Sequence, residues 1–338
     1  MRQWNTILKY IMLRLKIENK MFTHNKILNF IKQNKISLLL ILILIFGLAL
    51  RLYFFVGIVY ADEQDEGIYL SNAINAYNGN LHFSKYKHLP HDYLPNPAEA
   101  FDFRTIVYLP PSFMFKIFGI SELSAISFSL LYSLATLIII FHIARIYFDE
   151  KVGLIAAFLY SFFPLDVLFS TRLMPDIAVT FYIWLGILIF LLAEKWNEES
   201  NPLAKNKKLL YFISGISFGL GYLAKISVFF AIIILFIYFL TTRKIKLNYL
   251  FIILGFLAVF TTEGLYYHAV TGDFLLNLHI TNGVYDQKLK FENPSNFDIM
   301  HGILKIWTLD GSKFVYYLPA AFGIKSSWQD INYFGLFY

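Results

Sequence analysis

Long apolar stretches dominate the chain and limit what it can fold into. A membrane-spanning helix needs about 17–25 mostly apolar residues. Stretches near residues 36–60, 122–147, 152–169, 177–193 and 249–269 meet that requirement. Of the 338 residues, 57% are hydrophobic and 15% are charged, whereas a soluble domain is about 25% charged. We therefore predict an all-α polytopic membrane protein.

One further apolar stretch, residues 209–241, is too long for one span and short for two. The basic residues Arg243, Lys244 and Lys246 follow it. A single span would place these residues outside the cell, against the tendency of basic loops to stay in the cytoplasm. A helical hairpin that turns near Lys225 keeps them inside, so we predict the hairpin.

The distribution of charge sets the orientation and the domain boundaries. Eight of the 29 basic residues lie in the first 35 positions, which indicates a cytoplasmic basic segment over residues 1–35. We expect one transmembrane domain over residues 36–338 in the cell membrane, with outer loops at residues 61–104 and 270–312. The net charge of +6 is thereby explained without a nucleic-acid partner. The chain has no cysteine, which excludes disulfides and thiol chemistry.

The pair Asp65-Glu66 is the feature that says most about function. It follows the first predicted span, where a lipid-borne substrate would present its headgroup. A carboxylate there can take a proton from an acceptor hydroxyl or amine, although it can also be a solvated loop charge. The pair Asp62-Glu63 is a rival, but no tyrosine lies at the same spacing behind it. The periodicity over residues 65–78 predicts a helix lying on the membrane.

Other charged groups gather at the same outer ends of the predicted spans. With Asp65 they are Glu66, Arg104, Arg172, Asp176 and Lys225. An enzyme that takes a sugar from a polyprenyl-phosphate lipid needs this layout, because arginine and lysine bind phosphate and stabilise the charge of the leaving group. Ordinary alternatives stay open: the cations can be interface residues, and Asp176 can stabilise a helix N-terminus. Arg51 is interpreted as a snorkelling residue at the end of the first span.

The remaining motifs carry weaker signals. Four residues could bind a divalent metal: His82, His88, His91 and Asp92. Their spacing matches no strong metal signature, so we name no metal ligands and leave the cofactor unknown. Gly215, Gly219 and Gly221 are interpreted as helix-packing positions. Residues 105–119 are expected to form an interfacial segment split by Pro110-Pro111.

The pattern Asp65-Glu66-x-x-Tyr69-x-x-x-Ala73 resembles the Asp-Glu loop of GT-C glycosyltransferases. Within that class it is similar to the protein O-mannosyltransferases and the lipid A aminoarabinose transferases. Further matches follow in family order, from about residue 36 to 280. They are Arg104, Tyr108-Leu-Pro-Pro111, Phe115-Lys-Ile-Phe-Gly-Ile-Ser-Glu-Leu-Ser124, Gly153-Leu-Ile-Ala-Ala157, Phe163-Pro164, Arg172-x-x-x-Asp176, Gly219-Leu-Gly-Tyr-Leu-Ala-Lys225 and Thr271-Gly-Asp273.

The resemblance implies transfer of a sugar from a polyprenyl-phosphate donor to a lipid, protein or glycan acceptor on the extracytoplasmic face. It makes Asp65 the general base and Glu66 the second catalytic candidate. It also implies that Tyr69, Arg104, Arg172, Asp176 and Lys225 line the substrate site. Family members usually continue through more spans, so we expect a fragment or a short variant. The rival interpretations are a lipid-linked-sugar flippase and a non-catalytic lipid-binding subunit.

Overall fold

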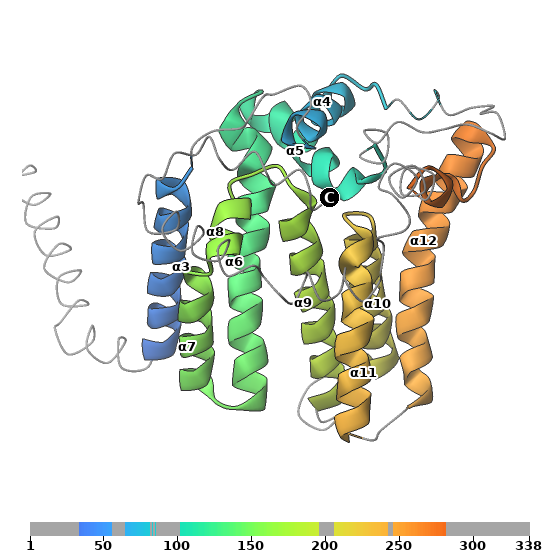
Figure 1. Ribbon diagram of the computed structural model, residues 1–338. Helices are drawn as coiled ribbons and strands as arrows, with labels where there is room; N and C mark the ends of the chain where they lie inside the picture. Colours follow the sequence, from blue (N-terminus) through green and yellow to red (C-terminus); the bar gives the residue numbers. More distant parts are fainter. Residues whose placement is uncertain are drawn as a thin grey trace, which may run out of the picture.

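The computed structural model describes residues 34–55, 65–81, 83, 85, 102–195, 206–242 and 246–281. Within these residues the regular structure is helical throughout, and the long helices stand side by side as a bundle (Figure 1). Among the described residues, four helical segments are long and apolar enough to cross a membrane. They are α3 (Lys35–Tyr53), α6 (Glu122–Tyr147), α9 (Pro175–Lys195) and Leu247–Thr271, which joins the short helix η5 (Leu247–Tyr249) to α12 (Leu250–Thr271). The predicted all-α polytopic membrane fold is confirmed.

Two shorter helices, α4 (Asp65–Tyr77) and α5 (Thr105–Phe118), pack together across one end of the bundle (Figure 1). We call this the site end. The surface helix predicted over residues 65–78 is thus present as α4. The predicted split of residues 105–119 is wrong, because α5 continues through Pro110 and Pro111. Its buried face, which includes Tyr108 and Phe115, packs on α4 and α6, and this packing outweighs the two lost backbone hydrogen bonds.

The predicted hairpin over residues 209–241 is confirmed. α10 (Lys207–Tyr222) leads through the short helix η4 (Ile226–Phe229) into α11 (Phe230–Thr242). α10 packs between α9 and α12. A Cβ atom on Gly215 would lie 2.0 Å from the Ile252 carbonyl oxygen, and one on Gly219 would lie 2.7 Å from the Val259 Cβ. These glycines let two helices approach closely, as predicted.

The predicted single span over residues 152–169 is wrong. The segment forms α7 (Glu150–Ser161) and a separate short helix, α8 (Pro164–Phe169). Pro164 has no backbone N–H and disfavours helical geometry in the preceding residue, and Phe163 accordingly has ψ of 114°. At about 1.5 Å per residue, α7 rises only about 18 Å, so it ends inside the bundle.

Arg51 is not a snorkelling residue. Its side chain is fully buried and forms an ion pair with Asp166 of α8. The guanidinium also donates to the Ser133 Oγ at 2.6 Å and to the Gly47 carbonyl oxygen at 2.8 Å, and Tyr160 donates to the other Asp166 oxygen at 2.6 Å. In a low-dielectric interior, a cation needs this degree of pairing and hydrogen bonding. The carboxylate comes from the first turn of α8, the short helix that follows the break after α7.

Several predictions fall on parts of the chain outside the described residues. They concern most of the basic segment 1–35, the pair Asp62-Glu63, the candidate metal ligands His82, His88, His91 and Asp92, and residues 282–312 of the second outer loop. They stay predictions.

Candidate active site

The site end is organised around the first turns of α4. This helix begins with Asp65 and Glu66, where a helix N-terminus favours negative charge because its first N–H groups lack intrahelical partners. Tyr69 lies one turn after Asp65 on the same face. Asp65 and Tyr69 therefore share one face, and Glu66 reaches the turn that precedes α9.

Glu66 anchors α4 to the turn that precedes α9. Its side chain is only 1% exposed, and its Oε1 accepts the backbone N–H of Leu173 at 3.1 Å. Its Oε2 lies 3.6 Å from the Nη1 of Arg172 in the same turn. A buried carboxylate held by a charge and a backbone N–H fixes the two segments relative to each other.

Tyr69 is the buried centre of the site. Its hydroxyl accepts a hydrogen bond from Arg104, whose guanidinium carbon lies 5.9 Å from the ring centroid. Burial raises the pKa of the Tyr69 hydroxyl well above its usual range; Arg104 lowers this pKa, whereas Asp65 and Asp176 raise it. The pKa of this hydroxyl therefore depends on charged side chains from α4, from the segment before α5 and from the start of α9.

Asp176 and Lys225 form the second ion pair of the site. The Lys225 Nζ lies 3.0 Å from the Asp176 Oδ1, with side-chain exposures of 21% and 31%. Asp176 follows Pro175 in the first turn of α9, and Lys225 has extended backbone geometry just after α10. The turn before α9 and the turn after α10 therefore bring Asp176 and Lys225 together.

All seven site residues predicted from the sequence lie at this end of the bundle. Arg104 donates a hydrogen bond to the Tyr69 hydroxyl, and Lys225 pairs with Asp176. The charges of Asp65 and Asp176 raise the pKa of Tyr69. Glu66 and Arg172 form the neighbouring pair. Chemically, this places a potential base on α4 near partly exposed cations, which suits an anionic leaving group.

The sequence interpretation missed two acidic residues in apolar surroundings. Asp166 pairs with Arg51, and the Glu263 Oε1 in α12 accepts the side-chain amide of Asn277 at 2.9 Å. The usable signal was an acidic residue within an apolar stretch, which is a functional candidate by default. Within the part of the chain that the structure describes, no group of three or more His, Asp or Glu side chains is placed to hold a metal ion.

A bundle of apolar helices with a charged cluster at one end defines a polytopic membrane protein with a candidate site at the edge of the bundle. Residues 108–266 match the model of the dolichyl-phosphate-mannose-protein mannosyltransferase family. The match confirms the resemblance to GT-C enzymes over these residues. Searches of curated proteins and of solved structures found no match.

The matched segment includes Arg172, Asp176 and Lys225. It begins after Asp65, Glu66, Tyr69 and Arg104. The family match therefore does not extend to these four residues.

Proposed function

We propose that the protein transfers a sugar from a polyprenyl-phosphate donor to an acceptor at the extracytoplasmic face of the membrane, with Asp65 as general base. The observation that carries the proposal is the position of the Tyr69 hydroxyl. It accepts a hydrogen bond from Arg104, and its pKa is raised by the charges of Asp65 and Asp176. A carboxylate and a cation from different segments thus share one small region beside the Lys225–Asp176 pair.

The reaction is a single displacement at the anomeric carbon. The acceptor oxygen forms the new bond to this carbon while the bond to the phosphate oxygen breaks, and the leaving polyprenyl phosphate keeps the electron pair. Asp65 takes the proton of the acceptor hydroxyl. Arg104, Arg172 and Lys225 stabilise the charge that develops on the phosphate, because preorganised cations need no rearrangement during the reaction.

The two ion pairs keep the cations in place between turnovers. Glu66 acts as a positioning residue, because it is buried and holds both Arg172 and the Leu173 N–H. Asp176 orients Lys225, and the partial exposure of this pair lets a donor phosphate replace the carboxylate at small cost, since partly exposed ion pairs are weak.

The extracytoplasmic orientation rests on the charges at the other end of the bundle. Arg145, Lys195, Lys207 and Lys208 lie at ends of α6, α9 and α10 that point away from α4. Basic residues concentrate on the cytoplasmic side of membrane proteins, which supports an outward orientation of the site end.

The test is transfer of labelled sugar from a polyprenyl-phosphate donor in membranes that contain the wild type or Asp65→Asn. We expect Asp65→Asn to lower the rate by about 10²–10⁴-fold. Glu122→Gln is the matched control, because Glu122 also lies in the first turn of a helix at the site end. Equal rates for the wild type and Asp65→Asn would remove Asp65 from the mechanism. Donor binding without transfer by either form would favour a non-catalytic lipid-binding subunit.

A further inference from the structure

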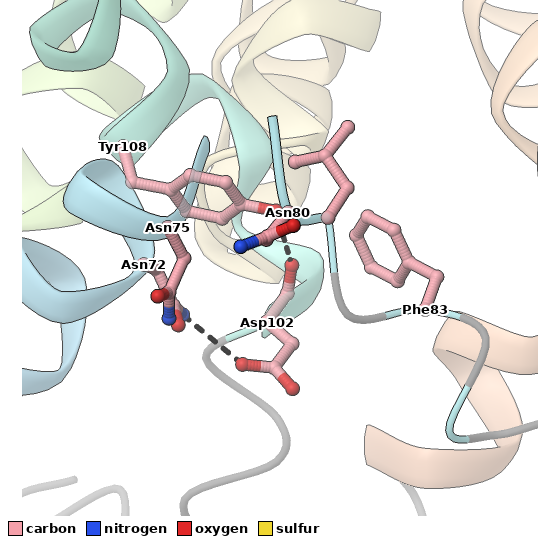
Figure 2. A pocket seen from close by; sticks show the side chains of 7 residues that line it. Asn72, Asn75, Asn80, Phe83, Asp102 and Tyr108 are labelled. Atoms are coloured by element: carbon pink, nitrogen blue, oxygen red, sulfur yellow. Dashed lines mark hydrogen bonds between the residues drawn. The ribbon is translucent and has the colours of Figure 1, made fainter. Parts of the chain in front are cut away.

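A groove lined by apolar side chains runs between α3 and α7, and none of the site residues lines it. Its volume is about 440 Å³, which lies within the range of about 300–1,000 Å³ that is usual for ligand sites. The cavity beside α4 is far smaller, about 10 Å³, and Asn72 and Asp102 in its lining already bond each other (Figure 2). Of these two cavities, only the groove has room for a ligand.

The groove lies at membrane depth. Its lining includes Leu39, Leu42 and Phe46 from α3 and Leu154, Ile155 and Phe158 from α7. Only 11% of the apolar stretch of α3 is buried in the bundle. At about 1.5 Å per residue, the α3 part of the lining extends from about 6 to about 17 Å beyond Lys35, where the helix begins. One leaflet of the hydrocarbon core is about 15 Å thick, so the groove spans the acyl region of one leaflet.

The two helices that form the groove run side by side in the same direction. Both begin at the end of the bundle opposite the site end (Figure 1). The rings of Phe46 and Phe162 have centroids 5.0 Å apart, and a Cβ atom on Gly47 would lie 3.5 Å from the Ser161 Cβ. Because both helices rise equally per residue, this register places Lys35 level with the start of α7.

Each wall of the groove continues into a lysine at this end. Lys35 lies four residues before Leu39, and Lys151 lies four residues before Ile155. Residues four apart are neighbours on one helix face, so each lysine lies one turn below a lining residue. Both lysines are exposed, and neither forms an ion pair with another described residue. Two cations therefore flank one end of an apolar groove.

The acidic residues beside Lys151 are already bound to other groups. Asp149 accepts the backbone N–H groups of Lys151 and Val152 at 2.7 and 2.8 Å, and so caps α7. Glu150 pairs with Arg145 at 2.7 Å. The carboxylates thus neutralise a helix end and an arginine, and the lysine charges stay available to an anion.

The start of α3 adds to the positive character of this end. The helix has no acidic residue in its first turn and no side-chain cap hydrogen bond from Asn34. Along the sequence, residues 1–35 contain eight basic residues and one acidic residue, Glu18. Basic segments next to a membrane span attract anionic lipids, so the lipids near this end of the groove are enriched in negative headgroups.

An apolar groove within one leaflet that ends at two lysines matches the two parts of an anionic phospholipid. An acyl chain fits the apolar walls, and the phosphate fits the ammonium groups, which are phosphate-binding point charges. A zwitterionic choline headgroup would bring its own cation near the lysines and is therefore disfavoured. We propose that the groove between α3 and α7 binds an acyl chain of an anionic phospholipid, with Lys35 and Lys151 on its phosphate. The site residues take no part, so this inference does not rest on the proposed function.

The test measures lipid binding to the purified full chain in detergent by native mass spectrometry, with phosphatidylglycerol and phosphatidylcholine of identical acyl chains. We expect phosphatidylglycerol to bind about tenfold more tightly. The double variant Lys35→Gln/Lys151→Gln should lose most of this preference, because each lysine near an anionic lipid contributes about fivefold. Equal affinity of the wild type for the two lipids would overturn the inference.

A second double variant and a groove-filling variant separate a specific site from general attraction. Lys195→Gln/Lys208→Gln removes two exposed lysines at the same end of the bundle, on α9 and α10, and should keep the preference. Ile155→Trp fills the groove at a side chain that is 59% exposed and should weaken the binding of both lipids severalfold.

Three results of these measurements would overturn the inference. The first is an equal loss of preference in the two double variants, which would indicate non-specific attraction to the surface. The second is unchanged lipid binding in Ile155→Trp. The third is a dimer without bound lipid, which would assign the groove to a second copy of the chain.

Discussion

Two kinds of charged cluster can be compared in this protein, one inside the bundle and one at its end. The Arg51 and Asp166 side chains are 0% and 3% exposed, and groups from α3, α6 and α7 surround them. The Lys225 and Asp176 side chains are 21% and 31% exposed and join chain segments next to two helix ends. The same type of ion pair therefore occurs in two very different dielectric environments.

The comparison suggests two different uses of charge. A buried pair is costly to break because the remaining ion is left in a low-dielectric interior without an opposite charge. A partly exposed pair is worth little, so either member can change partners. The Arg51–Asp166 cluster therefore fixes how α3 meets α8, whereas the partly exposed pair of Lys225 and Asp176 can exchange partners, as the proposed binding of a substrate phosphate requires.

The largest expected effect concerns the buried pair. Arg51→Ala leaves Asp166 without its cation and should lower the free energy of unfolding by about 3–5 kcal/mol, measured by thermal or denaturant unfolding in detergent. Arg145→Ala is the matched control, because its pair with Glu150 has side-chain exposures of 48% and 44%, and it should cost about 1 kcal/mol or less. Similar losses of stability in the two variants would contradict the expected difference between a buried and an exposed ion pair.

Much of the fold follows from local sequence signals. Apolar length and basic loops located α3, α6, α9 and the hairpin of α10 and α11. The break between α7 and α8 was missed, although Phe163-Pro164 marks it, because apolar length alone favoured one span. The pairing of Arg51 with a residue 115 positions away has no local signal, since it depends on how three helices pack.

The candidate site was predicted more completely than its internal contacts. Topology placed its six charged residues at one end of the bundle, and the family resemblance added Tyr69. It gave no reason for Glu66 to accept the N–H of Leu173, which lies 107 residues further along the chain. The hydrogen bond between Asn72 and Asp102 was missed as well, because it needs the end of α4 and the segment before α5 to meet.

At the site end, Glu66 should behave most like the buried pair, because it is 1% exposed. Glu66→Ala leaves the Leu173 N–H without its acceptor and Arg172 without its carboxylate, and we expect a loss of about 2–3 kcal/mol of stability. Glu66→Gln keeps an oxygen for Leu173 and should cost less than half as much. Both are measured by unfolding in detergent. Equal losses would show that the charge on Arg172, and not the backbone hydrogen bond, dominates.

Lys225 should show the reverse pattern, with a larger effect on function than on stability. Lys225→Ala removes a charge-assisted contact to phosphate and should raise the donor KM about tenfold. Its stability should change by less than about 1 kcal/mol, since the pair with Asp176 is partly exposed. Lys116→Ala, in an exposed position on α5, is the control and should alter neither quantity. An unchanged donor KM in Lys225→Ala would separate this lysine from the phosphate.

The smallest expected effect concerns Tyr69, which is neutral, unlike the charged residues of the site. Burial raises the pKa of Tyr69 above its usual value of 10, so the folded state favours the protonated hydroxyl. Its contribution is complete below that usual value and is lost only as the pH rises through the higher folded pKa. Between about pH 6 and 9 the hydroxyl therefore stays protonated and keeps its contact with Arg104.

Tyr69→Phe should lower the transfer rate by about three- to tenfold, because one hydrogen bond to Arg104 is lost. The pH–rate profiles of Tyr69→Phe and of the wild type should have the same shape over this range, since Tyr69 contributes no titration there. Tyr77→Phe, in the last turn of the same helix, is the control and should leave the rate unchanged. A limb of the wild-type profile that disappears in Tyr69→Phe would mean that this hydroxyl does titrate, and Tyr69 would then belong with the charged groups of the site.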